Sequence, residues 1–328
     1  MYKRQLENLF CNDNNLVELN INNNADLKSL LCGSNNLLSI DVSNNPSLET
    51  LNCADNQIQN LNVVNNLNLK SLTASGNQIP DIDISNNADL TFLNVSNNRI
   101  VGELEVLNNP DLENLFCASN QISTLDLSIN TLLRNLDVSD NVLTILDLSN
   151  INTVVCPDPQ TDPVTNCQGT STINVSRNHL SSLILANGHN NLISSLNTTE
   201  NTDLFCIQVD GGFTIPTGWV KDEWTYYSEN TCVDIYTYVP DDNFEQALID
   251  LGYDDILDNL VLTTNINTLI DLNISNASIS SLVGIEDFLA LENLDCNTNS
   301  LDDISLFNNL ALQQFDVSNN NLSVLDVS

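Results

Sequence analysis

The side chains able to take part in catalysis are few in this chain, and their spacing does not bring them together. The only two histidines, His179 and His189, lie ten residues apart, which is the length of one half-repeat of this sequence. The sequence has no Cys-x-x-Cys pair, no glycine-rich phosphate loop and no G-x-S-x-G nucleophile motif. We therefore predict no catalytic centre and expect that the protein is not an enzyme.

Carboxylates are abundant, with 43 Asp and Glu against 8 Lys and Arg and a formal net charge of −35. At this density acidic pairs arise by chance, so Asp254–Asp255 and Asp302–Asp303 are interpreted as solvated acids. Asp158 and Asp162 are weak candidates for calcium ligands, because a dedicated calcium loop usually supplies more oxygens and a sharp Gly. We expect no cofactor and no metal site, with calcium at this pair as the one alternative.

The charge also limits the partners. A nucleic-acid binder needs a basic footprint, so nucleic acid is excluded as a partner. No stretch of 18 apolar residues exists, so we expect no membrane insertion. The acidic surface is either simply solvated or a low-affinity surface for cations, and the sequence leaves both interpretations open.

Cysteines fall into two groups. Four lie outside the repeats, and we predict the disulfides Cys156–Cys167 and Cys206–Cys232, which suit an oxidising compartment. The remaining five occupy one inward repeat position, where Val replaces them elsewhere. They are interpreted as small buried hydrophobes, and they are Cys11, Cys32, Cys53, Cys117 and Cys296.

A repeated phrase must position all of these residues. It consists of an aliphatic, two residues, an aliphatic, one residue, a small apolar residue, two residues and Asn, as in residues 27–35 and again in 37–45. Two phrases make a unit of 21 residues, within the range of leucine-rich repeats. The Asn falls at positions 14, 24, 35, 45, 56, 66, 77, 87, 98, 109, 120, 130 and 141.

This period predicts a β-rich solenoid: a right-handed leucine-rich-repeat superhelix with short parallel strands, few helices and two arrays in series. Each phrase contains a short segment that alternates between inward and outward residues. We therefore predict two short parallel sheets, the first of them the more regular. The Asn side chains are expected to donate to and accept from the backbone of the turns.

Breaks in the period predict the domain organisation. Residues 1–151 form the first array, and 152–172 form an insertion loop closed by a disulfide. Repeats resume over 173–196 and are followed by a cap or linker over 197–232. A helical entry cap and the start of a second array occupy 233–328. In that cap Phe244, Leu248 and Leu251 share one helical face, and Gly252 ends the helix.

Outward strand positions are the candidate ligand surface, because stacked coils present them as one broad face. The first ladder mixes apolar and polar side chains, which suits protein or sugar contacts. Its members are Phe10, Leu31, Asn52, Thr73, Asn94, Phe116 and Asp137. The second ladder is polar and acidic, and comprises Asn20, Asp41, Asn62, Asp83, Glu105, Asp126 and Asp147.

The phrases at 51–58 (Leu-Asn-Cys-x-x-Asn-x-Ile) and 40–45 (Ile-Asp-Val-Ser-Asn-Asn) resemble bacterial leucine-rich repeats of surface and secreted proteins, related loosely to the internalins. The chain is most similar to multi-array proteins exported by type IX secretion. That resemblance implies a cleaved signal peptide, a C-terminal sorting domain and adhesion or partner binding. Because neither targeting element is in this sequence, we interpret it as a fragment of a secreted or cell-surface protein.

Three functions fit these residues. The favoured one is a non-catalytic extracellular module that binds a protein or mediates adhesion. A carbohydrate-associated module that binds a polysaccharide is the second, with exposed aromatics of the cap such as Trp219 and Trp224 as the stacking surface. The third is a passive spacer that displays another domain.

Overall fold

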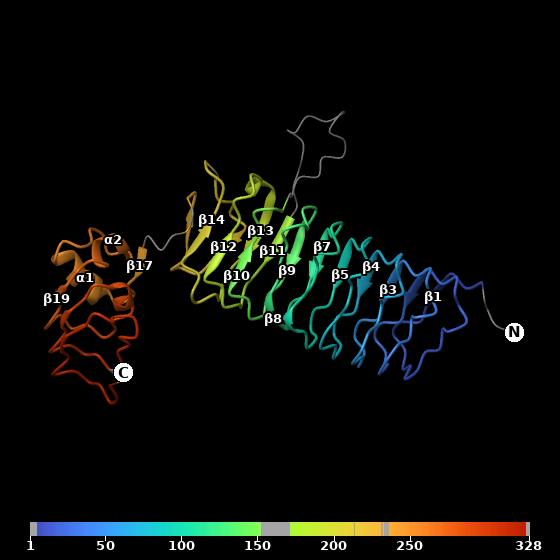
Figure 1. Ribbon diagram of the computed structural model, residues 1–328, viewed down its shortest axis with the longest axis horizontal. Helices are drawn as coiled ribbons and strands as arrows, with labels where there is room; N and C mark the ends of the chain where they lie inside the picture. Colours follow the sequence, from blue (N-terminus) through green and yellow to red (C-terminus); the bar gives the residue numbers. More distant parts are fainter. Residues whose placement is uncertain (1–4, 152–170, 213, 231, 233–235, 326–328) are drawn as a thin grey trace. The chain divides into compact units, whose positions relative to one another are not determined.

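A computed structural model describes residues 5–151, 171–212, 214–230, 232 and 236–325. These residues form a parallel β-solenoid with few helices (Figure 1), as the repeat predicts. The chain divides into two units, Met1–Thr231 and Cys232–Ser328, and each has an apolar core of its own. Among the described residues, no helix is long and apolar enough to cross a membrane.

The first unit is built on one sheet of ten parallel strands, with one strand from each successive coil. Its strands have a buried middle residue between two more exposed ones through most of the stack, which makes one face core and the other surface. The strands are, in spatial order, β1 (Asn8–Phe10), β2 (Ser29–Leu31), β3 (Thr50–Asn52), β4 (Ser71–Thr73), β5 (Phe92–Asn94), β7 (Asn114–Phe116), β9 (Asn135–Asp137), β11 (Ser171–Asn174), β13 (Ile193–Asn197) and β15 (Trp219–Val220).

The second half of each coil is less regular, as expected. Its strands begin only at Val101 within the described residues, and they form two short parallel sheets instead of a continuous one. One sheet pairs β6 (Val101–Glu103) with β8 (Gln121–Thr124). The other contains β10 (Ile145–Asp147), β12 (Ser182–Ile184), β14 (Cys206–Gln208) and β16 (Tyr226–Ser228). A short 3-10 helix, η2 (Asn190–Leu192), precedes β13.

The segment 197–232 was expected to be a cap or linker. Its strands β14 and β16 belong to the sheet of β10 and β12, and its strand β15 ends the ten-stranded sheet. It therefore continues the stack. The repeat is hard to see there because aromatic residues such as Trp219 and Tyr227 take core positions and the loops are longer. Cys206 and Cys232 are disulfide-bonded, which confirms that predicted bridge. The predicted bridge Cys156–Cys167 lies outside the described residues.

Buried Asn side chains link each coil to the one before it. In the ladder on the sheet side, Asn56 is typical: its Nδ2 donates to the carbonyls of Cys53 and Ala54 in its own coil and of Cys32 in the preceding coil, at 3.1, 3.1 and 3.2 Å. Its Oδ1 accepts from the backbone N–H of Leu37 at 2.9 Å. The predicted role of the Asn, to donate and to accept, is therefore met in full on this side.

The Asn ladder on the far side behaves differently. Asn66 donates from Nδ2 to the carbonyls of Val42 and Asn45 in the preceding coil, at 3.0 and 2.9 Å. Its Oδ1 has no hydrogen-bond partner among the described residues. The same is true of Oδ1 of Asn45, Asn87, Asn109 and Asn130, all of which are buried. Both ladders consist of Asn and both donate to backbone carbonyls, but only the sheet-side Asn also accepts a hydrogen bond from a backbone N–H.

A left-handed residue precedes each sheet-side Asn. Ser34 and Asp55 have φ of 53° and 52°, and Asp13, Asn97, Ser119 and Asp140 adopt φ between 53° and 56° in their own coils. Asp and Asn tolerate this conformation better than most residues. At the equivalent position in another coil, Gly76 has φ of 64°. The turn therefore explains why the residue before this Asn is mostly small or polar.

The second unit begins with a two-stranded antiparallel sheet of β17 (Tyr236–Tyr238) and β18 (Leu260–Leu262). Between them lies α1 (Asp242–Asp250), which Asp241 caps by accepting from the N–H groups of Asn243 and Phe244. The remaining elements are α2 (Thr263–Ile266), η3 (Ile285–Asp287) and the parallel strands β19 (Asp271–Asn273), β20 (Asn293–Asp295) and β21 (Gln314–Asp316).

The predicted helix of this entry cap is present, with Phe244 and Leu248 fully buried on one face. Leu251, expected on the same face, is 46% exposed because the helix ends at Asp250 and Gly252 turns the chain at φ of 82°. Asp241 also accepts from Ser280 and Ser281 in the first turn of the following array. The helix is thus fastened to the coils that it covers.

Replacing a sheet-side Asn should destabilise the first unit. In Asn56→Leu three carbonyls and one N–H lose a buried partner, so we expect the free energy of unfolding to fall by about 3 kcal/mol or more. Urea denaturation followed by circular dichroism measures this loss. Asn60→Leu, at an exposed position of the same coil, is the control and should change stability by less than about 0.5 kcal/mol. Equal effects of the two substitutions would contradict the role of the ladder.

Candidate functional site: the outer face of the first sheet

The structure places all seven residues of the first predicted ladder in one column on the outer face of the first sheet. Each is the last residue of its strand, and each is paired in register with the next, from Phe10 opposite Leu31 to Phe116 opposite Asp137. Phe10 is 63% exposed, and the other six are partly exposed. A binding partner would therefore meet these side chains as one row.

The column is longer than the period predicts. Asn174, Asn197 and Val220 follow Asp137 in register on β11, β13 and β15. Sequence reasoning missed them because the segment 152–170 interrupts the spacing between the coils. Pairing between strands, which the interruption does not change, is the signal that locates them.

An aromatic pair on this face was also missed. Phe92, the first residue of β5, lies in the neighbouring outward column, and its ring centroid is 5.6 Å from that of Phe116 on β7. Both side chains are partly exposed. Phe92 escaped notice because only the last residue of each strand was considered, although the first residue of a three-residue strand faces outward as well. The two adjacent aromatic rings bring partly exposed apolar surface to this part of the face.

One edge of the face carries alternating charges. The residue directly before the strand is basic or acidic in six coils, and neighbouring coils pair opposite signs. These exposed pairs contribute little to stability, but they leave the edge nearly neutral in an otherwise acidic protein. The pairs are Glu7–Lys28 at 3.0 Å, Glu49–Lys70 at 3.0 Å and Glu113–Arg134 at 3.7 Å.

The second, acidic ladder is occupied by local hydrogen bonds. Asp41 accepts from the hydroxyl and the backbone N–H of Ser43, and these bonds lower the pKa of its carboxyl. Asp83 does the same with Ser85. The acids therefore stay charged and fix the turn that follows them, in the manner of an Asx-turn. This arrangement gives them a structural role that needs no bound cation.

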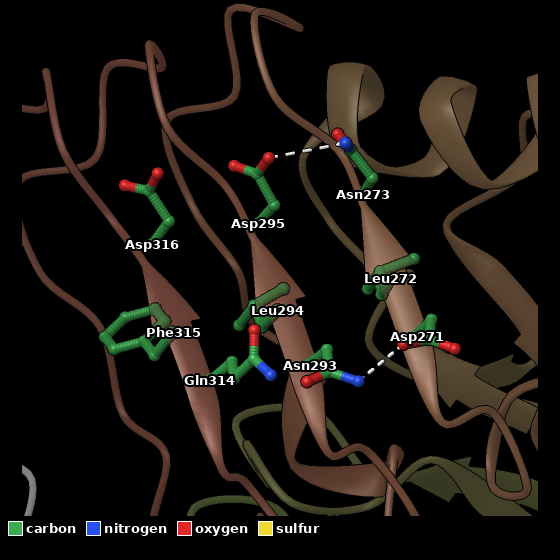
Figure 2. Close-up of a pocket in the computed structure, with 9 residues that line it drawn as sticks. All are labelled: Asp271, Leu272, Asn273, Asn293, Leu294, Asp295, Gln314, Phe315 and Asp316. Atoms are coloured by element: carbon green, nitrogen blue, oxygen red, sulfur yellow. Dashed lines mark hydrogen bonds between the residues drawn. The ribbon is translucent and has the colours of Figure 1, made fainter.

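The corresponding outer face of the second unit is polar. A hollow of about 430 Å³ lies over β19, β20 and β21, and Figure 2 shows the side chains that line it. Asn293 donates to Asp271 at 2.5 Å, and Asn273 donates to Asp295 at 3.3 Å. Polar side chains thus hold one another in place across the strands. The outward strand positions therefore carry different kinds of side chain in the two units.

Four of the five inward cysteines, Cys32, Cys53, Cys117 and Cys296, are buried as predicted, whereas Cys11 in the first coil is only partly buried; all five are free thiols. Burial raises the pKa of Cys32 and of Cys296 to about 12, and it raises the pKa of Cys53 and Cys117 further. Thiols with such values carry almost no thiolate at neutral pH and are poor nucleophiles. The four buried side chains fill the core.

The other residues considered for catalysis, metal binding or sugar stacking do not come together in one site among the described residues. His179 is exposed, and no group of three or more His, Cys, Asp or Glu side chains among the described residues could hold a metal ion. The calcium candidates Asp158 and Asp162 lie outside the described residues. Trp219, considered for sugar stacking, is only 7% exposed and donates from Nε1 to the carbonyl of Ile193 at 2.9 Å. Trp219 therefore belongs to the core, whereas Trp224, the other candidate for sugar stacking, is partly exposed.

Comparisons with known proteins give low similarity. No protein-family model and no curated protein matches the chain. Among solved structures, the functional domain of InlJ from Listeria monocytogenes, whose description includes a cysteine ladder, is 22% identical over 98% of this chain and 60% of its own, with a TM-score of 0.41.

Two further solved structures resemble the chain at the same level. YopM from Yersinia enterocolitica is 20% identical over 94% of this chain and 58% of its own, with a TM-score of 0.43. An internalin, inlF, from Listeria monocytogenes is 16% identical over 98% and 83%, with a TM-score of 0.40. This chain spans less than two thirds of InlJ and YopM. These values do not assign it to a family.

The burial of the cysteines predicts their reactivity. In the native protein at pH 8, iodoacetamide should leave Cys32, Cys53, Cys117 and Cys296 almost unmodified, because each combines burial with a raised pKa. Peptide mapping by mass spectrometry measures the modified fraction at each position. The same reaction in 6 M guanidinium is the control and should modify all four. Rapid modification of any of them in the native state would show that its coil is open.

Proposed function

We propose that this chain is a non-catalytic binding module whose partner is a protein, and that the outer face of the first sheet is the contact surface. The observation that carries the proposal is the unbroken column of partly exposed side chains on one sheet. Repeated coils supply a broad, rigid face, and rigid faces bind without a large entropic cost. Apolar side chains set among polar ones are typical of protein interfaces.

The paired rings of Phe92 and Phe116 are the proposed centre of contact. Aromatic side chains supply much of the binding energy in protein interfaces when they are buried by the partner. The nearly neutral charged edge beside them lets an acidic protein approach at this face, whereas the strongly acidic remainder of the chain would repel it. A polysaccharide partner is less well supported, because only one of the two candidate stacking residues, Trp224, is partly exposed, while Trp219 lies in the core.

We further propose that the module acts outside the cell, on a secreted or surface-attached bacterial protein, where it mediates adhesion. The disulfide between Cys206 and Cys232 supports an oxidising compartment. The net charge of −35 favours solubility and disfavours non-specific association with anionic membranes. We propose that no cofactor takes part in this binding, because the contact surface consists of ordinary side chains.

Substitution of the aromatic pair tests the contact surface. The purified chain is immobilised and probed with a panel of bacterial and host surface proteins and surface polysaccharides. For a protein that binds, we expect Phe92→Ser together with Phe116→Ser to weaken binding about ten-fold or more. Surface plasmon resonance measures the change in Kd.

The matched control is Val101→Ser, which removes a 62% exposed apolar side chain from β6, outside the first sheet. It should leave the Kd unchanged. Equal loss in both variants would place the contact elsewhere. A polysaccharide that binds while every protein fails would support the carbohydrate-associated alternative, and silence across the panel would support a passive spacer.

A further inference from the structure

The outer face of the first sheet carries an almost balanced set of charges, although the net charge of the chain is −35. Its surface over the seven consecutive strands from β1 to β9 is formed by three positions of each coil: the residue directly before the strand, the first strand residue and the last one. Four acids and three bases occupy these positions, which leaves a net charge of −1. They are Glu7, Glu49, Glu113 and Asp137 against Lys28, Lys70 and Arg134. Nearly all of the negative charge of the chain therefore lies elsewhere.

Charges along the edge of this face alternate in sign over most of its length. The residues directly before the seven strands are, in order, Glu7, Lys28, Glu49, Lys70, Thr91, Glu113 and Arg134. The six charged side chains form three ion pairs within the chain, and each is between 35% and 55% exposed. Each charge therefore has one partner of opposite sign in its own chain and keeps enough exposed surface to meet a second one.

This order of charges is complementary to itself when it is reversed. A two-fold axis parallel to the strands brings two copies face to face with opposite coil order, so that the charged edges of the two faces meet. When all seven coils overlap, Glu7 lies opposite Arg134 of the second copy. In the next coil Lys28 lies opposite Glu113, and the third coil meets the fifth, which has no charge at this position. Only Lys70, at the axis, faces its own counterpart, and its ion pair within the chain, at 3.0 Å, offsets that contact.

Other registers bring like charges together. A shift by one coil in one direction places Glu7 opposite Glu113 of the second copy. A shift by one coil in the other direction places Lys28 opposite Arg134. That second shift also places Glu49 opposite Glu113. Because facing like charges are costly in an interface, the edge favours the register in which all seven coils overlap.

The uncharged positions of the face fit the same register. Leu31 lies opposite Phe116 of the second copy, and the two-fold symmetry makes this apolar contact twice. Phe92, beside Phe116, faces a threonine, and Ser, Thr and Asn oppose one another over most of the remaining positions. Phe10 gains little, because it faces Asp137 at the end of the overlap. The centre of this contact is thus polar and neutral, with apolar contacts on both sides of the axis.

We propose that this face binds the same face of a second copy of the chain in the register in which all seven coils overlap. The inference rests on the proposed function, because it names a partner for the same binding face. Seven strands about 4.8 Å apart and four residues of about 3.3 Å each give a flat area of about 400 Å². A typical stable interface buries about 800 Å² per partner, so the dimer should be weak in solution. Many copies displayed on two surfaces would add their contacts, which suits adhesion between like surfaces.

Self-association of the full chain tests the proposal. Sedimentation equilibrium is measured between about 1 µM and 1 mM protein in about 150 mM NaCl, which screens much of the repulsion between two acidic chains. We expect an equilibrium between monomer and dimer. Glu7→Arg and Arg134→Glu should each weaken it about ten-fold or more, because like charges then face each other at both ends of the overlap. An equimolar mixture of the two variants should regain the native affinity, since each variant supplies the charge that the other needs.

Glu18→Arg is the matched control, because it makes the same change of charge as Glu7→Arg at an exposed acid of the first coil that lies outside the sheet. It should not weaken the association, and circular dichroism verifies the fold of all three variants. A chain that stays monomeric up to about 1 mM overturns the proposal. Two weakened variants that do not recover on mixing, or an equal loss in Glu18→Arg, overturn it as well. The proposed function survives each of these results if a protein of the panel binds and the double substitution of Phe92 and Phe116 weakens that binding.

Discussion

Each coil of the first array must turn inside an apolar core, and its turning carbonyls cannot reach water. The sheet-side Asn resolves this conflict, because one amide group serves carbonyls of two successive coils and accepts an N–H from the earlier one. Because this amide also bonds to the preceding coil, the length of that hydrogen bond helps to set the distance between neighbouring coils. Strand pairing, the inward positions of Leu and Cys, and the left-handed residue before the Asn all follow from where this side chain must sit.

The outward strand positions do not have to satisfy buried backbone groups, so their residue types are free to differ between the two units. In the first unit the outer face holds Phe10, Leu31 and the pair of Phe92 with Phe116, beside an edge of matched charges. In the second unit the equivalent face holds mutually hydrogen-bonded Asn and Asp. The same backbone thus presents two surfaces of different chemistry, and binding properties can change without cost to the core.

The sequence alone predicts the features that the regular repeat period determines, and it misses the features that depend on other interactions. The solenoid, the inward cysteines and the column from Phe10 to Asp137 follow from spacing, because equivalent positions in a regular stack must align. The continuation of the column through Asn174 to Val220 depends on strand pairing across an interrupted period, and the ring contact of Phe92 depends on rotamers. The different bonding of Asn56 and Asn66 also has no signal in the sequence, since both are Asn in the same phrase.

The distribution of basic residues links these observations. All eight Lys and Arg lie before residue 222, and five acids of the first unit, Glu7, Glu49, Glu113, Asp140 and Glu200, are paired with four of them across coils. The second unit has no basic residue, and its acids are accommodated by exposure to solvent or by hydrogen bonds from backbone N–H groups. Asp316 follows the second route through Ser318, and Asp302 follows the first. Glu245, which is buried on α1, also follows the second route, because its Oε1 accepts from the backbone N–H groups of Asp258 and Leu260. The position of an acid in the fold, and not a basic partner, thus decides how each acid of the second unit is accommodated.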